Sequence, residues 1–162
     1  MLGKLMRTAL GQEVIRLIMT KRGLACDKIL VRATGFSLLM HLFSAMTNFA
    51  PMPVLVIHTI GRRSGLGRSA TMPYVTVNGI HYLVASNGAK PNDSLWVDNL
   101  RAEPNARIDI DQQTIKVRAR VLDFDSAERV PAWDLAVKMN SQYAIYQQST
   151  SRQIPVIALD PI

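Results

Sequence analysis

Cysteine is almost absent from this chain, since Cys26 is the only one among 162 residues. An intrachain disulfide is therefore excluded, and the composition fits a reducing compartment. Metal ligands are also scarce, because carboxylates do not cluster and the three histidines, His41, His58 and His81, lie far apart in the sequence. We expect no metal site. No G-x-S-x-G nucleophile motif occurs either, so demanding chemistry should come from a bound cofactor.

Aromatic residues make up only 6% of the chain, and long apolar runs are missing. The net charge of +7 would suit nucleic acid, but no stripe of basic and aromatic residues offers a stacking surface, so we expect no nucleic-acid partner. The apolar stretch Phe36–Met46 is shorter than the ~20 residues that a membrane-spanning helix needs. No secretory signal pattern stands out. The expected location is the cytoplasm, with the inner face of the cell membrane as an alternative.

The positive charge that is present falls into two patches. Residues 1–49 contain seven basic and only two acidic side chains, and so carry +5 of the total charge. Beyond them the charges nearly cancel, except in the short segment 61–68, which contains Arg62, Arg63 and Arg68. Two separate patches suggest two anionic partners, for example a membrane surface and a cofactor.

Residues 1–49 are predicted to form an amphipathic helical extension. Apolar residues recur at helical spacing at two places, namely at Leu2, Leu5, Met6 and Ala9, and again at Val14, Leu17 and Ile18. Basic side chains such as Lys4, Arg7 and Arg16 are interspersed with them. A second, more apolar helix is expected over Gly35–Phe49, ended by Pro51 and Pro53. These helices can pack on their own domain or lie on an anionic bilayer, and the sequence leaves both possibilities open.

Residues 50–162 are predicted to form one domain rich in antiparallel strands. Asn78-Gly79 joins two β-type runs and is a strong signal for a two-residue hairpin. A second hairpin is expected around the connection 111–114, and helices are expected from Asp93 or Ser94 and from Asp125 or Ser126. About six strands with helices at the ends or on one side indicate an α+β fold with a barrel-like antiparallel sheet. An exposed sheet edge would make a homodimer plausible.

The segment 61–68 reads GRRSGLGR and follows an apolar strand. Glycines let backbone N–H groups approach a ligand, and clustered guanidinium groups bind phosphate or carboxylate oxygens. The segment is one residue too long for a Walker loop and lacks its lysine, and a strand follows where a dinucleotide fingerprint needs a helix. The segment therefore indicates a binding site for a polyanionic cofactor, with an ordinary basic surface turn as the alternative.

Other candidate side chains carry weaker signals. Tyr143 and Tyr146 lie on one face if their segment is helical, and their phenols could donate to an acceptor oxygen, although a half-buried aromatic pair fits equally well. His58 is most simply a hydrogen-bonded strand histidine. Asp109 and Asp111 alternate on one strand face and are expected to be solvated.

Three segments together resemble the deazaflavin-dependent nitroreductase family. Residues 58–65 with Arg68 are similar to its T-x-G-R-[KR]-[ST]-G-x-x-R signature. Residues 86–89, followed by Trp96, Asn99 and Leu100, look like its S-K-G-G…W-x-x-N-L segment. Residues 143–156 are similar to its Y-x-x-Y-Q…T-x-R-x-I-P-V end. The three segments occur in the family's order and extend over about residues 54–161.

The resemblance implies a split β-barrel that binds coenzyme F420, a deazaflavin carrying a phosphate and a polyglutamyl tail. It also implies hydride transfer to a small-molecule acceptor: a quinone, a nitro compound or an activated alkene. The catalytic residues that it implies are Tyr143, Tyr146 and Ser86. The cofactor-binding residues that it implies are Arg62, Arg63, Ser64, Gly65, Arg68, Tyr74, Ser86, Asn87, Gly88, Ala89, Trp96 and Asn99.

This sequence departs from the family pattern at four positions. Asn87 stands where the family has lysine, Ala89 where it has the second glycine, Thr71 where proline is usual, and Asn140 where a tyrosine often occurs. The changes fall around the ring and acceptor end, and the arginines are kept. Some relatives hold fatty acyl chains, so a lipid-binding protein of the same fold is the alternative function. Membrane association in the family would account for the basic N-terminal helices.

Overall fold

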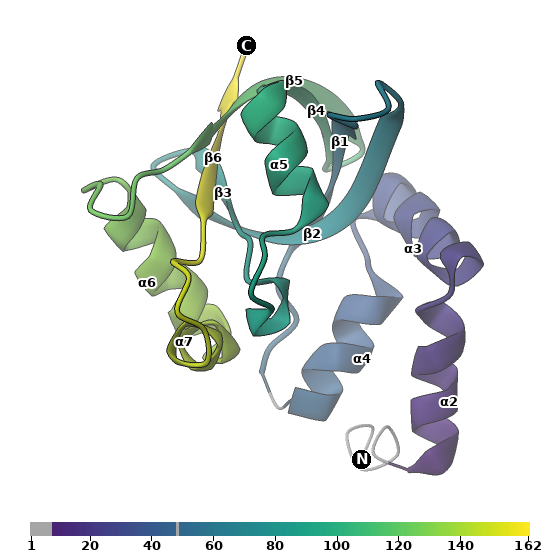
Figure 1. Ribbon diagram of the computed structural model, residues 1–162. Coiled ribbons are helices and arrows are strands. Elements are labelled where there is room, and N and C mark those ends of the chain that lie inside the picture. The colour runs from purple at the N-terminus through teal and green to yellow at the C-terminus, as the bar shows by residue number, and fades with distance from the viewer. Residues whose placement is uncertain (1–7, 48) are drawn as a thin grey trace.

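Six antiparallel strands form a closed barrel in the computed structural model, which describes residues 8–47 and 49–162 (Figure 1). Around the barrel the strands pair in the order β1-β2-β3-β6-β5-β4, and β4 pairs again with β1. Their bounds are β1 Val54–Ile60, β2 Gly67–Val77, β3 Ile80–Val84, β4 Asn105–Ile110, β5 Gln113–Val121 and β6 Val156–Pro161. The α+β class and the antiparallel barrel are confirmed. The expected exposed edge is wrong, because closure gives every described strand two neighbours.

Two tight turns set the register of the hairpins. Asn78 and Gly79 both have positive φ, at 51° and 81°, as the hairpin signal requires. The second hairpin turns through Asp111 and Gln112, with φ of 48° and 62°. Its connection is therefore two residues long, and the expected four-residue connection is wrong, because β5 already begins at Gln113.

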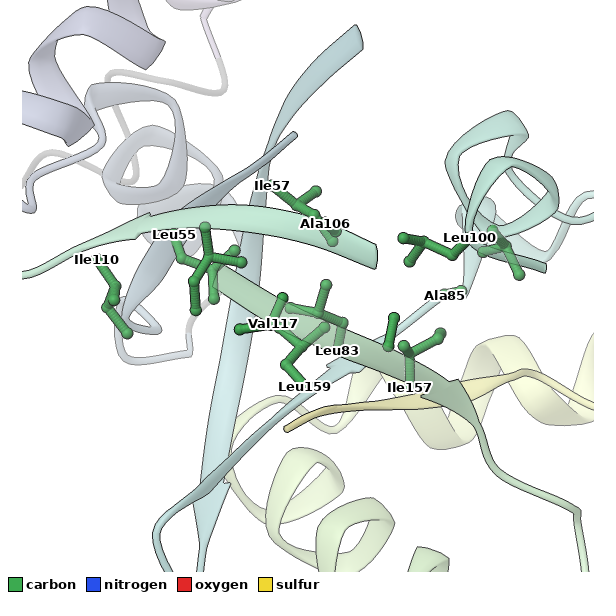
Figure 2. Close-up of a cluster of buried hydrophobic side chains, with 13 residues drawn as sticks. Leu55, Ile57, Leu83, Ala85, Leu100, Ala106, Ile110, Val117, Ile157 and Leu159 are labelled. Atoms are coloured by element: carbon green, nitrogen blue, oxygen red, sulfur yellow. The ribbon is translucent and has the colours of Figure 1, made fainter. Parts of the chain in front are cut away.

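The barrel interior is filled by side chains that alternate inward along the strands. Leu83 of β3 pairs with Ile157 of β6, and both are fully buried. Figure 2 shows Leu83, Val117 and Leu159, from three different strands, gathered in one cluster. Burial of such aliphatic side chains is the main force that holds the barrel together.

The C-terminal helices cover one outer face of the barrel. Helix α6 spans Arg129–Met139 and α7 spans Gln142–Gln148. The fully buried Ala132 and Ala136 let α6 approach the outward side chains of β2, β3 and β6 closely. The N-cap of α6 is Glu128, two residues after the expected cap at Ser126, and its side chain makes no cap hydrogen bond.

The N-terminal region contains three described helices, α2 Ala9–Ile18, α3 Lys21–Thr34 and α4 Leu38–Thr47. Thr20 caps α3 by accepting a hydrogen bond from the backbone N–H of Gly23, and Gly35 ends it with φ 72°. The expected helix over Gly35–Phe49 therefore begins later, at Leu38, and α3 was not anticipated as a separate helix. The expected helical positions Leu2, Leu5 and Met6, and the basic residues Lys4 and Arg7, lie outside the described residues.

The helices lie on opposite sides of the barrel. Figure 1 shows α6 and α7 on one side and α2 and α3 on the other, while α5, Leu95–Ala102, crosses the barrel between them. Among residues 8–47 and 49–162, no single helix has the length and apolar character needed to cross a membrane. Helices α3 and α4 meet that test only as a pair, and the pair is bent by 103°.

A polar cluster holds α3 against the barrel. Asp109 of β4 is 5% exposed, and its carboxylate accepts from His58 Nε2 at 2.7 Å and pairs with Arg32 Nε at 2.8 Å. Thr114 donates a further hydrogen bond at 2.7 Å. The expectation that Asp109 is solvated is wrong, because α3 covers it. Burial raises the pKa of Asp109, but the hydrogen bonds from His58 and Thr114 and the charges of His58 and Arg32 outweigh burial, so its pKa lies below 3.8.

We expect Asp109→Asn to lower the free energy of unfolding at pH 7 by about 1–3 kcal/mol, because its partners lose a charged acceptor. A depressed folded pKa gives stability that is present above the ordinary value of 3.8 and lost as the pH falls through the folded value. Denaturant unfolding of wild type and variant at neutral and acidic pH checks this. Their difference should shrink in acid, while the exposed control Asp125→Asn changes little at either pH. A difference that is the same at both pH values would contradict the account.

Candidate cofactor site

The arginine turn, residues 61–66, connects β1 to β2 and is closed by its own backbone. The N–H of Gly61 donates to the Leu66 carbonyl at 2.8 Å, and the N–H groups of Ser64 and Gly65 donate to the Gly61 carbonyl. Gly65 has φ 65°, which glycine adopts without strain. A Cβ added to Gly61 would lie 2.7 Å from Ser64 Oγ. Gly61 and Gly65 therefore suit this turn, whereas nothing within 4 Å would meet a Cβ at Gly67.

Asn99 of α5 fixes the arginine turn to the barrel. Its Oδ1 accepts from the backbone N–H of Arg62 at 3.0 Å, and its Nδ2 donates to Thr59 Oγ1 at 3.1 Å. Asn99 is only 7% exposed. A buried amide with both ends satisfied holds its neighbours in one arrangement. Asn99, expected as a cofactor contact, thus also positions the turn.

The turn forms one wall of a cleft of about 390 Å³, which we call the arginine cleft. Its lining comes from β1, the arginine turn, the start of β2 and the start of α5. The lining residues are Ile57, Thr59, Gly61, Arg62, Arg63, Ser64, Arg68, Ser69, Ala70, Leu95, Trp96 and Asn99. Six of the twelve predicted cofactor-binding residues therefore lie around one cleft. Gly65, at the tip of the turn, does not line it.

The cleft combines cationic side chains with apolar ones. Arg62 Nη2 is 3.3 Å from Asp98, so part of its charge is already balanced. Within the part of the chain that the structure describes, the side chains of Arg63 and Arg68 make no hydrogen bond or ion pair. Ile57 and Trp96 add apolar surface. Two uncommitted guanidinium groups beside apolar side chains suit a ligand that carries both a ring and anionic groups.

The segment 86–89 lies apart from the arginine cleft. Asn87, Gly88 and Ala89 form the short helix η1, and all three have positive φ. Glycine adopts such φ values readily, whereas asparagine and alanine do so at some cost. Ser86, which precedes them, contributes its carbonyl to a hydrogen bond from Arg152. Three successive residues, 87–89, therefore have left-handed backbone conformations, which their residue types did not predict.

Arg152 holds this segment in place. Its guanidinium donates to the carbonyls of Ser86 and Lys90 and pairs with Asp93 at 2.8 Å. Only 14% of its side chain is exposed. Arg152 belongs to the T-x-R-x-I-P-V segment of the sequence, but that pattern alone assigns it no role. The position of an arginine near the end of the chain could not show that it reaches back across more than 60 residues.

The predicted tyrosines lie outside the arginine cleft. Tyr143 is 4% exposed in the core beneath α6 and α7, and burial together with Tyr146 raises its pKa above the usual range. Tyr146 is half-buried on the same helix, and α7 contacts η1. Tyr74 packs against the barrel core, and burial and Asp111 raise its pKa. The predicted residues thus form one group at the arginine turn and a second around η1 and α7, with Tyr74 separate.

The family model described as F420H(2)-dependent quinone reductase matches residues 42–161. The chain belongs to this family. Rv1261c of Mycobacterium tuberculosis, an F420H(2)-dependent quinone reductase, is 30% identical over 108 residues, which cover 66% of this chain and 72% of the relative. The family assignment confirms the class of enzyme expected from the sequence, a reductase, and the expected cofactor, coenzyme F420.

Two solved structures support the F420H(2)-dependent quinone reductase fold. The F420-H2 dependent reductase FDR-A is 33% identical, with a TM-score of 0.60, and the match covers 67% of this chain and 94% of that one. A second structure, described as a domain-swapped dimer, is 28% identical with a TM-score of 0.61 and covers 84% of this chain and 94% of its own. The expected split barrel is confirmed.

Proposed function

We propose that this F420H(2)-dependent quinone reductase binds reduced coenzyme F420 with the anionic part of the cofactor in the arginine cleft and transfers its hydride to a quinone. The observation that carries the proposal is the pair of uncommitted guanidinium groups, Arg63 and Arg68, beside the apolar surface of Trp96. The family match supplies the donor and the quinone class of acceptor. Nitro compounds and activated alkenes remain further candidate acceptors.

Coenzyme F420, when bound, supplies a hydride from C5 of its reduced ring. The chain's own residues bind and orient it. Arg63 and Arg68 would neutralise phosphate and tail charge. Gly61 lets the turn that carries them close, because a Cβ there would lie 2.7 Å from Ser64 Oγ. Asn99 holds that wall rigid. Precise positioning of donor and acceptor accounts for much of the rate enhancement in such transfers.

The acceptor is proposed to lie near the second group, where α7 contacts η1. Reduction of a quinone carbonyl needs a proton as well as a hydride, and the half-buried hydroxyl of Tyr146 is our candidate for the donor. Tyr143 is deeply buried beside it. Burial raises its pKa, and a side chain that is only 4% exposed offers little surface to an acceptor, so we assign the proton to Tyr146.

We expect Tyr146→Phe to lower kcat with a quinone by about tenfold to a hundredfold, because a general acid contributes that order of rate or more. The dissociation constant for coenzyme F420 should stay nearly unchanged, since Tyr146 lies outside the arginine cleft. Steady-state kinetics and a fluorescence titration measure the two quantities. Tyr143→Phe is the matched control, and should affect kcat less. Equal losses in turnover and cofactor affinity would show that Tyr146 has another role.

Turnover itself tests the proposal. Purified protein should oxidise reduced coenzyme F420 when a soluble quinone is added, and the absorbance of the oxidised deazaflavin should return. A titration followed by the fluorescence of the cofactor should saturate at micromolar concentrations. Absence of saturable binding would exclude the proposed function.

The acyl-binding alternative has less support. An acyl chain needs an apolar cavity, but the barrel interior is filled by buried side chains, including Leu55, Leu83 and Ile157. The arginine cleft carries three cationic groups, which favour an anionic ligand. Mass spectrometry of extracts from the purified protein checks this point, and we expect no bound fatty acid.

We also propose that residues 1–49 form an extension distinct from the barrel domain 50–162 and contact the membrane surface. The family model begins only at residue 42. Leu17, Ile29 and Phe43 expose apolar side chains on α2, α3 and α4, and α2 and α3 also carry basic residues that anionic lipids attract. We expect Leu17→Glu with Ile29→Glu to reduce sedimentation with anionic vesicles. Val130→Glu on α6 is the control, and equal sedimentation of all three proteins would end the membrane proposal.

A further inference from the structure

A second cavity, of about 380 Å³, lies where β5 leads into α6 (Figure 1). Its lining comes from the connection after β5, the first residue of α6, the chain just before β6, and Arg101 of α5. We call it the α6 cavity. Among the described residues, none lines both this cavity and the arginine cleft. The α6 cavity is therefore a separate place for a ligand.

Arg129 is a buried cation in the wall of the α6 cavity. It is the first residue of α6 and is only 6% exposed. Its guanidinium carbon lies 4.4 Å from the ring centroid of Phe124 and 4.8 Å from that of Trp133. Its Nη2 donates to the Ile154 carbonyl at 3.2 Å. The aromatic faces stabilise the cation, but they leave the other N–H donors at the edge of the guanidinium unused.

No carboxylate neutralises Arg129. Across residues 8–47 and 49–162, it forms no ion pair, and its Nε and Nη1 make no hydrogen bond. These atoms are not sealed in the core, because Thr71 Oγ1 is the only buried side-chain nitrogen or oxygen without a partner in the described part of the chain. Burial lowers the pKa of Arg129, and no anion opposes that shift. Buried arginines are normally paired, so this charge points to an anionic ligand.

The rest of the lining indicates which anion fits. Arg101 already pairs with two aspartates, the nearer at 2.7 Å, so Arg129 carries the uncommitted positive charge. Asp123 is exposed and adds a negative charge to the lining, which disfavours a doubly charged ligand. Phe124 is 47% exposed and offers an apolar surface. One free cation, one aspartate and an aromatic wall suit a monocarboxylate with an apolar body.

We propose that the α6 cavity binds a small organic acid, with its carboxylate on the guanidinium of Arg129 and its apolar part against Phe124. The volume of the cavity exceeds what a bare ion needs and accommodates such a molecule. The site is independent of the proposed function, because it shares no described lining residue with the arginine cleft.

Tryptophan fluorescence tests the site directly. The chain contains two tryptophans, Trp96 and Trp133. Trp96→Phe therefore leaves Trp133, which contacts the Arg129 guanidinium, as the reporter. We expect cyclohexanecarboxylate to give a saturable change at millimolar concentrations or below, at constant ionic strength. Cyclohexanecarboxamide, which has the same shape without the charge, and inorganic phosphate should both bind at least about tenfold more weakly.

Two further variants in the Trp96→Phe protein test the charges of the site. Arg129→Gln should weaken binding of cyclohexanecarboxylate at least about tenfold. Asp123→Asn should strengthen it about twofold to fivefold, because it removes an exposed negative charge beside the carboxylate. Asp125→Asn, an exposed position outside the cavity, is the control and should leave the affinity unchanged. Thermal melting verifies that each variant is folded.

The contrary results are equally definite. Absence of a saturable change would overturn the site, because Trp133 contacts the group that the acid would bind. Equal affinity for the acid and the amide would remove the role of Arg129, and phosphate binding as tightly as the acid would exclude a monocarboxylate site. An Asp123→Asn protein that binds no more tightly than the Asp125→Asn control would also contradict the proposal. These comparisons decide the matter even if Arg129→Gln does not fold.

Discussion

We expect Arg63→Gln combined with Arg68→Gln to raise the dissociation constant for coenzyme F420 about a hundredfold or more, because hydrogen bonds to charged groups contribute about 1.5–3 kcal/mol each. Both guanidinium groups line the arginine cleft and have no competing partner among the described residues. Removal of either should therefore cost affinity rather than stability. Fluorescence titration measures the affinity, and thermal melting measures the stability.

The control for this variant removes equal charge elsewhere. Arg16 and Arg22 lie exposed on α2 and α3, away from the cleft. Arg16→Gln with Arg22→Gln should change the dissociation constant by less than about threefold at physiological salt, where distant exposed charges are largely screened. Similar losses in the two double variants would mean that only the overall positive charge attracts the cofactor, and the arginine turn would lose its assigned role.

The second large effect concerns the barrel. Leu83→Ala should lower the free energy of unfolding by about 2–5 kcal/mol, as for other buried leucines whose removal leaves a cavity. Leu83 is fully buried in the interior and pairs with Ile157. Denaturant unfolding measures the change.

Leu17→Ala is the matched control, because Leu17 is 61% exposed on α2. It should change the free energy of unfolding by no more than about 0.5 kcal/mol. Saturating cofactor should raise the melting temperature of both variants, since it binds only the folded barrel. A small loss in Leu83→Ala would mean that the interior can collapse around the deletion, and that the barrel depends less on this cluster than its burial indicates.

Local signals in the sequence predicted much of the barrel. Asn78-Gly79 requires positive φ at both positions, so its hairpin was visible in the residues themselves. Closure of the barrel was not, because pairing of β1 with β4 joins segments about 50 residues apart. Alternation of apolar residues gives the inward face of a strand and does not identify its neighbour.

In the candidate site, too, local features could be predicted and long-range contacts could not. The arginine turn could be predicted, since its glycines and arginines are contiguous in the chain. The buried environment of Asp109 could not, because Arg32 and His58 reach it from distant segments. Residues whose roles depend on long-range contacts leave little trace in a single sequence.

A crystal structure of the protein with coenzyme F420 bound tests the central claim most directly. The account predicts the phosphate of the cofactor within hydrogen-bonding distance of the Arg63 and Arg68 guanidinium groups, with the arginine turn still bonded to Asn99. A cofactor bound elsewhere on the barrel, with the arginine cleft filled only by solvent, would contradict it.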